Sequence, residues 1–160
     1  MNPCRVDFQE LYRRHLCRHS QYGLNVLHLL AVTGVYWALL GLVCLLPAGQ
    51  YLAGAGIGLY LVVLSRNLPW KVFLATACFV AGLLALSLVA PPAPWWVYIL
   101  GAVCAHRFQV LQHRYYDHSF EMSQFDVKYP KGPGLALLLA VYELPILMQF
   151  LLGQVERAEQ

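Results

Sequence analysis

The sequence predicts an all-α fold, a multi-pass transmembrane helical bundle of four to five apolar helices. Hydrophobic residues make up 59% of the 160 residues, and charged residues only 12%. This charged fraction is about half that of an ordinary soluble domain and cannot cover a water-facing surface. The apolar residues also form long continuous blocks, broken by short segments rich in proline, glycine or basic residues. We therefore expect a single integral membrane domain over residues 1–160.

Each expected helix corresponds to one apolar block that follows a polar N-terminal segment, residues 1–21. Blocks of about twenty residues match the hydrocarbon thickness of a bilayer. The spans are expected at about residues 24–46, 51–64, 72–90, 95–113 and 135–152.

Two of these blocks are irregular. The second is short and contains Gly54, Gly56 and Gly58, small residues that would let neighbouring helices approach closely. The fifth contains Glu143 and Pro145, so it either crosses the membrane or forms a hairpin or a surface helix.

The basic residues predict the orientation. Lysine and arginine occur in the N-terminal segment and within residues 66–71 and 107–131, but not in the breaks at 47–50 and 91–94. Alternating spans place the three basic regions on one side, which the positive-inside rule makes cytoplasmic. We expect a location in the inner membrane if the protein is bacterial, and in the endoplasmic reticulum if it is eukaryotic. Nucleic-acid binding is not expected, because it would need these charges on one solvated patch.

All six histidines fall near the cytoplasmic ends of two expected spans. They lie around the start of the first span and around the end of the fourth: His15, His19, His28, His106, His113 and His118. His15 and His19 are four residues apart, and His106 and His113 are seven apart, so each pair shares a helix face. Histidine is the commonest metal ligand, and imidazole with carboxylate at one depth suits a first-row metal. The pattern predicts a metal site at this face of the bilayer.

Simpler interpretations stay open for single residues. A histidine at a helix end can place its ring among lipid head groups, whereas His28 lies inside an apolar stretch, where a polar ring needs a partner. Asp117 is either a ligand or a solvated ion-pair partner, and Glu143 is either structural or part of the site. Asn25, one turn before His28, either orients that ring or satisfies the backbone near the helix start.

The stretch from His19 to His28, which includes Asn25, resembles the opening motif of the membrane family of 2-hydroxy fatty acid dioxygenases. These are iron-dependent proteins of fatty acid α-oxidation from the fungal endoplasmic reticulum, with many bacterial relatives. In that family a histidine, a short linker with asparagine and a second histidine lead into the first span. Asn25 stands one position later than the motif has it.

A second family motif is similar to the segment from Gln109 to His113, with Asp117 after it. Gln112 stands where the family usually has glycine, and Asp117 where it usually has glutamate. The closing block with Glu143 is similar to the family's last helix, which also carries a glutamate. The resemblance extends over nearly the whole chain in the order and spacing of the blocks.

The resemblance implies Fe(II), held by His19, His28 and His113, with further ligands among His118, His15 and Asp117. Around these ligands we expect Asn25, Gln109, Glu143 and His106, of which His106 has no counterpart in the family motif. It further implies O₂ and a 2-hydroxy fatty acid as substrates and a product that is one carbon shorter. A fatty acid in a bilayer keeps its head group at the interface, the depth at which the histidines gather.

Two other functions remain compatible with the sequence. One is a different metal-dependent lipid hydroxylase or desaturase, which would hold two metals. The other is a non-enzymatic multi-pass membrane protein, such as a small transporter or assembly factor, whose histidines are structural. Metal stoichiometry separates the first from the dioxygenase, and loss of His28 without loss of function would favour the second.

Overall fold

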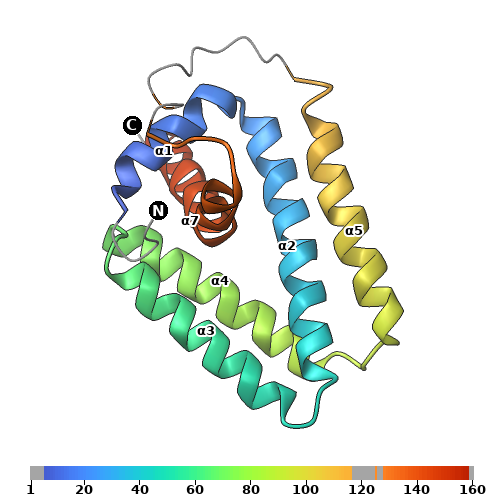
Figure 1. Ribbon diagram of the computed structural model, residues 1–160. Helices are drawn as coiled ribbons and strands as arrows, with labels where there is room; N and C mark the ends of the chain where they lie inside the picture. The colour runs from blue at the N-terminus through green and yellow to red at the C-terminus, as the bar shows by residue number, and fades with distance from the viewer. Residues whose placement is uncertain (1–5, 117–124, 126–127, 159–160) are drawn as a thin grey trace.

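The chain is a bundle of helices. The computed structural model describes residues 6–116, 125 and 128–158, with side chains through residue 154. Within these residues there are six helices and no strand, so the all-α class is confirmed. The helices are α1 (Phe8–Arg18), α2 (Tyr22–Cys44), α3 (Gly49–Ser65), α4 (Trp70–Val89), α5 (Trp95–Gln112) and α7 (Pro133–Ala158) (Figure 1). Each helix from α2 onward begins within two residues of an expected block.

The expected number of spans needs a correction. Three of the described helices are long and apolar enough to cross a membrane: α2, α4 and α7. The apolar helix α3 has only 17 residues, somewhat short for a bilayer. In α5, 18 residues long, His106, Arg107 and Gln109 make the second half polar. The expected four to five spans included α3, which does not meet the length condition, and α5, which is not apolar enough.

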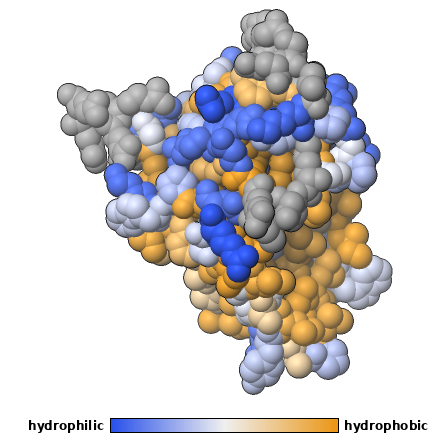
Figure 2. Space-filling model, turned by 60° about the vertical axis from the view of Figure 1, so that its left-hand side comes forward, coloured by the Kyte–Doolittle hydropathy of each residue, from blue (hydrophilic) through white to orange (hydrophobic). Residues whose placement is uncertain are grey.

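The basic segments lie together at one end of the bundle. Helices α2, α3, α4 and α5 run alternately in opposite directions (Figure 1). The backbone N–H of Val6 donates to Asn67 Oδ1 at 3.2 Å, which ties the N-terminal segment to the α3–α4 break. Figure 2 shows hydrophilic residues concentrated at one end and a mainly hydrophobic surface below it. This polarity fits a helix bundle that presents one polar end to the membrane surface.

Helix α1 was not expected as a separate element. Its N-cap is Asp7, whose carboxylate accepts a hydrogen bond from the backbone N–H of Glu10 at 3.0 Å, satisfying one of the free N–H groups of the first turn. Phe8 and Leu11 are buried, and the Phe8 ring lies 6.4 Å from that of Tyr142 in α7. The N-terminal segment therefore includes an amphipathic helix packed on the bundle.

Helix α7 is the most enclosed of the three potential spans. Half of the side chains in its span-length window, 50%, are buried within the protein, against 28% in α2 and 22% in α4. In Figure 1 it is seen almost along its axis, between α1 and α2. Its buried side chains form much of the hydrophobic core: Leu135, Leu138, Tyr142, Leu144, Ile146, Leu147, Met148 and Phe150.

Pro145 lies within α7 without ending it. Proline has no N–H, so the carbonyl of Val141, four residues earlier, loses its helical partner. The hydroxyl of Tyr60 in α3 donates to this carbonyl at 3.0 Å. A hydrogen bond from another helix thus replaces the missing one, which is how apolar surroundings tolerate an internal proline. The uncertainty about the fifth block is resolved in favour of one continuous helix.

Close packing between long helices occurs at glycines of α2, and not at the three expected glycines of α3. A Cβ added at Gly54, Gly56 or Gly58 would meet nothing within 4 Å, so the expected close approach at these glycines is wrong. In α2, by contrast, a Cβ on Gly41 would come within 2.2 Å of the Tyr98 ring in α5. A Cβ on Gly34, two turns earlier, would lie 3.1 Å from Ala105 Cβ. These two glycines let α5 pack along α2.

Substitution of Gly41 by alanine is expected to destabilise the protein by about 1–3 kcal/mol, because the added methyl group displaces the Tyr98 ring. Gly56→Ala is the matched control. There the added methyl group meets open space, and the higher helix propensity of alanine makes the change neutral or slightly stabilising. Thermal unfolding in detergent measures both. Equal shifts in the two variants would contradict the packing at Gly41.

Candidate metal centre

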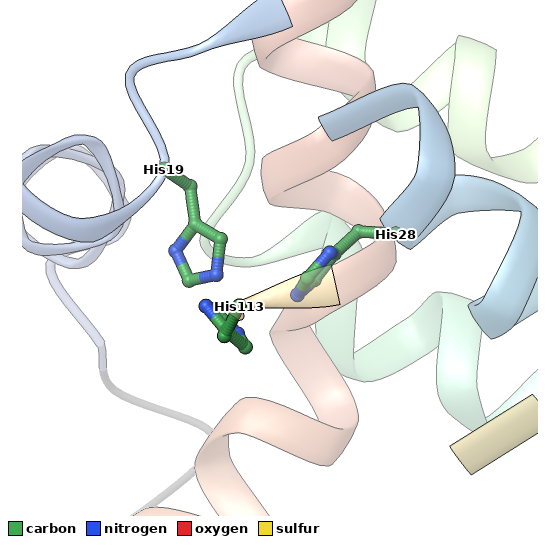
Figure 3. Close-up of side chains that lie close together, drawn as sticks. All are labelled: His19, His28 and His113. Carbon is green, nitrogen blue, oxygen red and sulfur yellow. The ribbon is translucent and has the colours of Figure 1, made fainter. Parts of the chain in front are cut away.

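Three histidines from three segments meet at the polar end of the bundle. His19 directly follows α1 as its C-cap residue, His28 lies in the second turn of α2, and His113 is the C-cap residue of α5. Figure 3 shows their rings turned toward one another. The glycine packing of α2 against α5 brings the second and third together, and the α1–α2 corner adds the first.

The rings form a nearly regular triangle. Ring centroids are 4.7 Å apart for His19 and His28, 4.9 Å for His19 and His113, and 5.0 Å for His28 and His113. One nitrogen from each ring can be chosen so that all three lie within 4.8 Å of one another. A metal ion about 2.1 Å from three tetrahedrally placed nitrogens holds them about 3.4 Å apart. Moving each nitrogen inward by about 0.8 Å would reach this geometry. The group can therefore hold a metal ion, and the convergence expected from the sequence is confirmed.

Backbone carbonyls orient two of the rings. His28 Nδ1 lies 3.1 Å from the carbonyl oxygen of Leu24, and His19 Nδ1 lies 3.4 Å from that of His15. A carbonyl only accepts, so each Nδ1 carries the proton and each Nε2 keeps a lone pair. His19 Nε2 is buried and has no hydrogen-bond partner within the described part of the chain. An outer hydrogen bond that sets the ring and leaves the other nitrogen bare is typical of metal-bound histidine.

Burial keeps His15 and His19, which lie outside the spans, neutral. Desolvation is the main reason that the pKa of His15 falls to about 4 and that of His19 to about 2. Neighbouring histidines lower the pKa of His19 further. A neutral imidazole offers the lone pair that a metal needs, whereas a protonated ring does not. At neutral pH, His19 is therefore in the state that binds metal.

His15 and Asn25 support the corner. His15 stacks on His19, with ring centroids 4.2 Å apart, and its Nε2 donates to Asn25 Oδ1 at 2.9 Å. The Asn25 amide nitrogen donates to the carbonyls of His19 at 2.6 Å and of Gln21 at 2.8 Å. The three-histidine group does not include His15. Asn25 orients His15 and the corner backbone, so of the two expected roles the one that satisfies the backbone near the helix start is confirmed.

The other expected site residues divide into two sets. His106 lies on the same face of α5 as His113 but is exposed and apart from the three-histidine group. Asp117 and His118 lie outside the described residues, so their expected place among the ligands stays a prediction.

An apolar groove leads away from the three histidines. It has a volume of about 1080 Å³, and its lining includes His113 together with residues of α2, α3, α5 and α7. Val32, Val35 and Leu39 contribute apolar surface from α2, while Gln109 and Glu143 face the groove from α5 and α7. The Gln109 amide donates to the Glu143 carboxylate. Between Ala102 and His113 the lining extends roughly 16 Å along α5.

Sequence reasoning did not single out Gln112 as a site residue. This side chain is only 2% exposed, and its Nε2 donates to the carbonyl of Leu27 at 3.1 Å. The bond joins the end of α5 to the turn of α2 that carries His28. The available signal for Gln112 was its position, as a polar side chain next to the expected ligand His113 at the end of an apolar block.

No protein-family model, no curated protein and no solved structure matches this chain.

Proposed function

We propose that this protein is a metal-dependent membrane enzyme that acts on the head-group end of an acyl lipid. The observation that carries the proposal is a triangle of three histidines, one of which, His113, also lines a long, mainly apolar groove. The histidines lie at the polar end of apolar helices, where the polar head of a membrane lipid also lies. His113 belongs both to the triangle and to the groove lining, so a ligand in the groove reaches the metal position.

The reaction we propose is Fe(II)-dependent oxidative shortening of a 2-hydroxy fatty acid by one carbon. The bond between C1 and C2 breaks, C1 leaves as carbon dioxide, and C2 becomes the new carboxyl carbon. One O₂ takes up the four electrons that this releases and also yields one water, so no further reductant is needed. Iron, when bound, supplies the one-electron chemistry that O₂ requires, and imidazole ligands suit it.

The residues of the chain have separate tasks in this proposal. His19, His28 and His113 would bind the metal, each through one ring nitrogen. The groove walls hold the acyl tail through apolar contact and keep water from the reacting carbon. The Gln109–Glu143 pair gives the groove a hydrogen-bonding group near the metal. With three histidine ligands, a six-coordinate ion would keep positions for both the hydroxyl and the carboxylate of the substrate.

The test uses protein purified in detergent under anaerobic conditions, with iron quantified before turnover. Iron-loaded protein given O₂ and a long-chain 2-hydroxy acid is expected to release an acid one carbon shorter, detected by its mass. The fatty acid of equal length without the hydroxyl is the matched control and is expected to stay intact. One iron per chain is expected. An unshortened product with iron bound would reject the dioxygenase, and two metals per chain would favour a hydroxylase or desaturase. Full activity of His28→Ala would mean that the histidines are structural.

A further inference from the structure

The amide oxygen of Gln112 is a buried hydrogen-bond acceptor with no partner among the described residues. The amide nitrogen of the same side chain donates to the Leu27 carbonyl, which fixes the orientation of the group. If the amide were rotated, its oxygen would face another carbonyl oxygen, and that arrangement is repulsive. The oxygen therefore points away from Leu27. An unsatisfied buried oxygen costs about 1–3 kcal/mol, so its retention calls for a functional explanation.

Within the described residues, no donor is assigned to this oxygen. The Gln112 side chain lies within hydrogen-bonding reach of the His28 ring. That ring already donates its Nδ1 proton to the Leu24 carbonyl, and a neutral imidazole has only one N–H. The ring nitrogen left for Gln112 is Nε2, which carries a lone pair. Two lone pairs on neighbouring atoms repel each other unless a cation or a donor lies between them.

We propose that the Gln112 amide oxygen is the fourth protein ligand of the metal ion held by His19, His28 and His113. The inference rests on the proposed function, because it requires that the three histidines bind a metal. A cation at the triangle resolves both mismatches, since it accepts the free Nε2 lone pair and the free amide oxygen. Amide oxygen joined to imidazole is a donor set that first-row divalent ions accept. With this ligand the protein supplies three nitrogens and one oxygen, which leaves two open positions on a six-coordinate ion.

The experiment measures metal affinity, not activity. Fe(II) is titrated anaerobically against a competing chelator in the full-length protein, and Co(II) is added separately to record its visible absorption. Gln112→Leu, which has a similar volume and no oxygen, is expected to weaken Fe(II) binding by at least about tenfold. Its Co(II) spectrum is expected to shift, because one ligand is lost. Gln112→Glu places a charged oxygen at the same position and is expected to bind both ions more tightly than the wild type.

Gln109→Leu is the matched control. Gln109 is the other glutamine in this part of α5, it lines the same groove, and its amide bonds to Glu143 rather than facing the three histidines. Its removal is expected to leave both the Fe(II) affinity and the Co(II) spectrum unchanged.

The outcomes separate the two proposals. A wild-type protein that binds neither ion would overturn the metal enzyme and the Gln112 ligand together. Normal binding in the wild type and an unchanged Co(II) spectrum in Gln112→Leu would overturn the role of Gln112 alone. The Leu27 contact is lost in both variants, so Gln112→Glu shows what an oxygen at this position contributes by itself. Affinity equal to or weaker than that of the wild type in this variant would reject the ligand assignment.

Discussion

Replacement of His113 by alanine is expected to remove bound metal and abolish turnover while the protein still inserts into the membrane. His113 supplies one corner of the triangle, and two remaining imidazoles do not hold a divalent ion tightly. Insertion depends on the apolar helices, which the change leaves intact. Metal content of the purified variant, helical circular dichroism in detergent and product mass form the three measurements.

His106→Ala is the control for this prediction. His106 lies two turns earlier on the same face of α5, lines the same groove and is exposed. Its loss is expected to leave the metal content unchanged and to reduce turnover by less than about tenfold, because it affects the groove and not the ligands. Loss of metal from His106→Ala, or its full retention by His113→Ala, would contradict the assignment of the triangle.

Replacement of Asn25 by alanine is expected to lower stability by about 2–4 kcal/mol and to weaken metal binding as well. Asn25 is fully buried, and its side chain makes three hydrogen bonds to the α1–α2 corner. Each bond lost inside the protein costs about 1–3 kcal/mol when the partner stays unsatisfied. The loss also releases His15 and the backbone of His19, so the His19 ring is no longer held toward the other two. Chemical or thermal unfolding and chelator titration measure the two effects.

Asn67→Ala separates the two effects of Asn25→Ala. Asn67 also makes three hydrogen bonds: it accepts from the Val6 backbone and donates to the Val63 carbonyl and to the Tyr142 hydroxyl. None of these reaches the three histidines. A similar loss of stability with unchanged metal affinity is expected. If Asn67→Ala weakens metal binding as much as Asn25→Ala does, the effect of Asn25 is general destabilisation and not positioning of His19.

The helices could be predicted closely because apolar blocks between proline, glycine and basic breaks leave little choice of boundary. It was harder to predict which helices can cross a membrane. Helix α3 is apolar but short, and α5 is polar in its second half. Helix α1 escaped prediction because its burial comes from α7, which lies more than a hundred residues later. The predicted close packing at Gly54, Gly56 and Gly58 of α3 was wrong for a related reason. A small residue indicates close packing only when a partner helix faces it, and no periodicity in the chain reveals the partner.

The triangle could be predicted in part. His28 stood out as a polar ring inside an apolar stretch, and the expected topology placed His19 and His113 at the same depth. The resemblance implied a ligand role for His15, but its Nε2–H donates to Asn25 and the ring is not part of the three-histidine group. Gln112 gave no comparable signal. An amide becomes informative only when its hydrogen-bond partners are known, and these come from Leu27 and His28 on another helix.

The burial of α7 within the bundle has a consequence for the synthesis of the protein. Glu143 and Pro145 make contact between this helix and lipid unfavourable. However, half of its span-length segment is buried within the protein. A ribosome delivers the chain from the N-terminus, so α1 to α5 leave it first. Helix α3, whose Tyr60 hydroxyl donates to the Val141 carbonyl, is therefore synthesised before α7. The groove wall that α7 provides is the last to be synthesised, so the groove is complete only when translation of α7 ends.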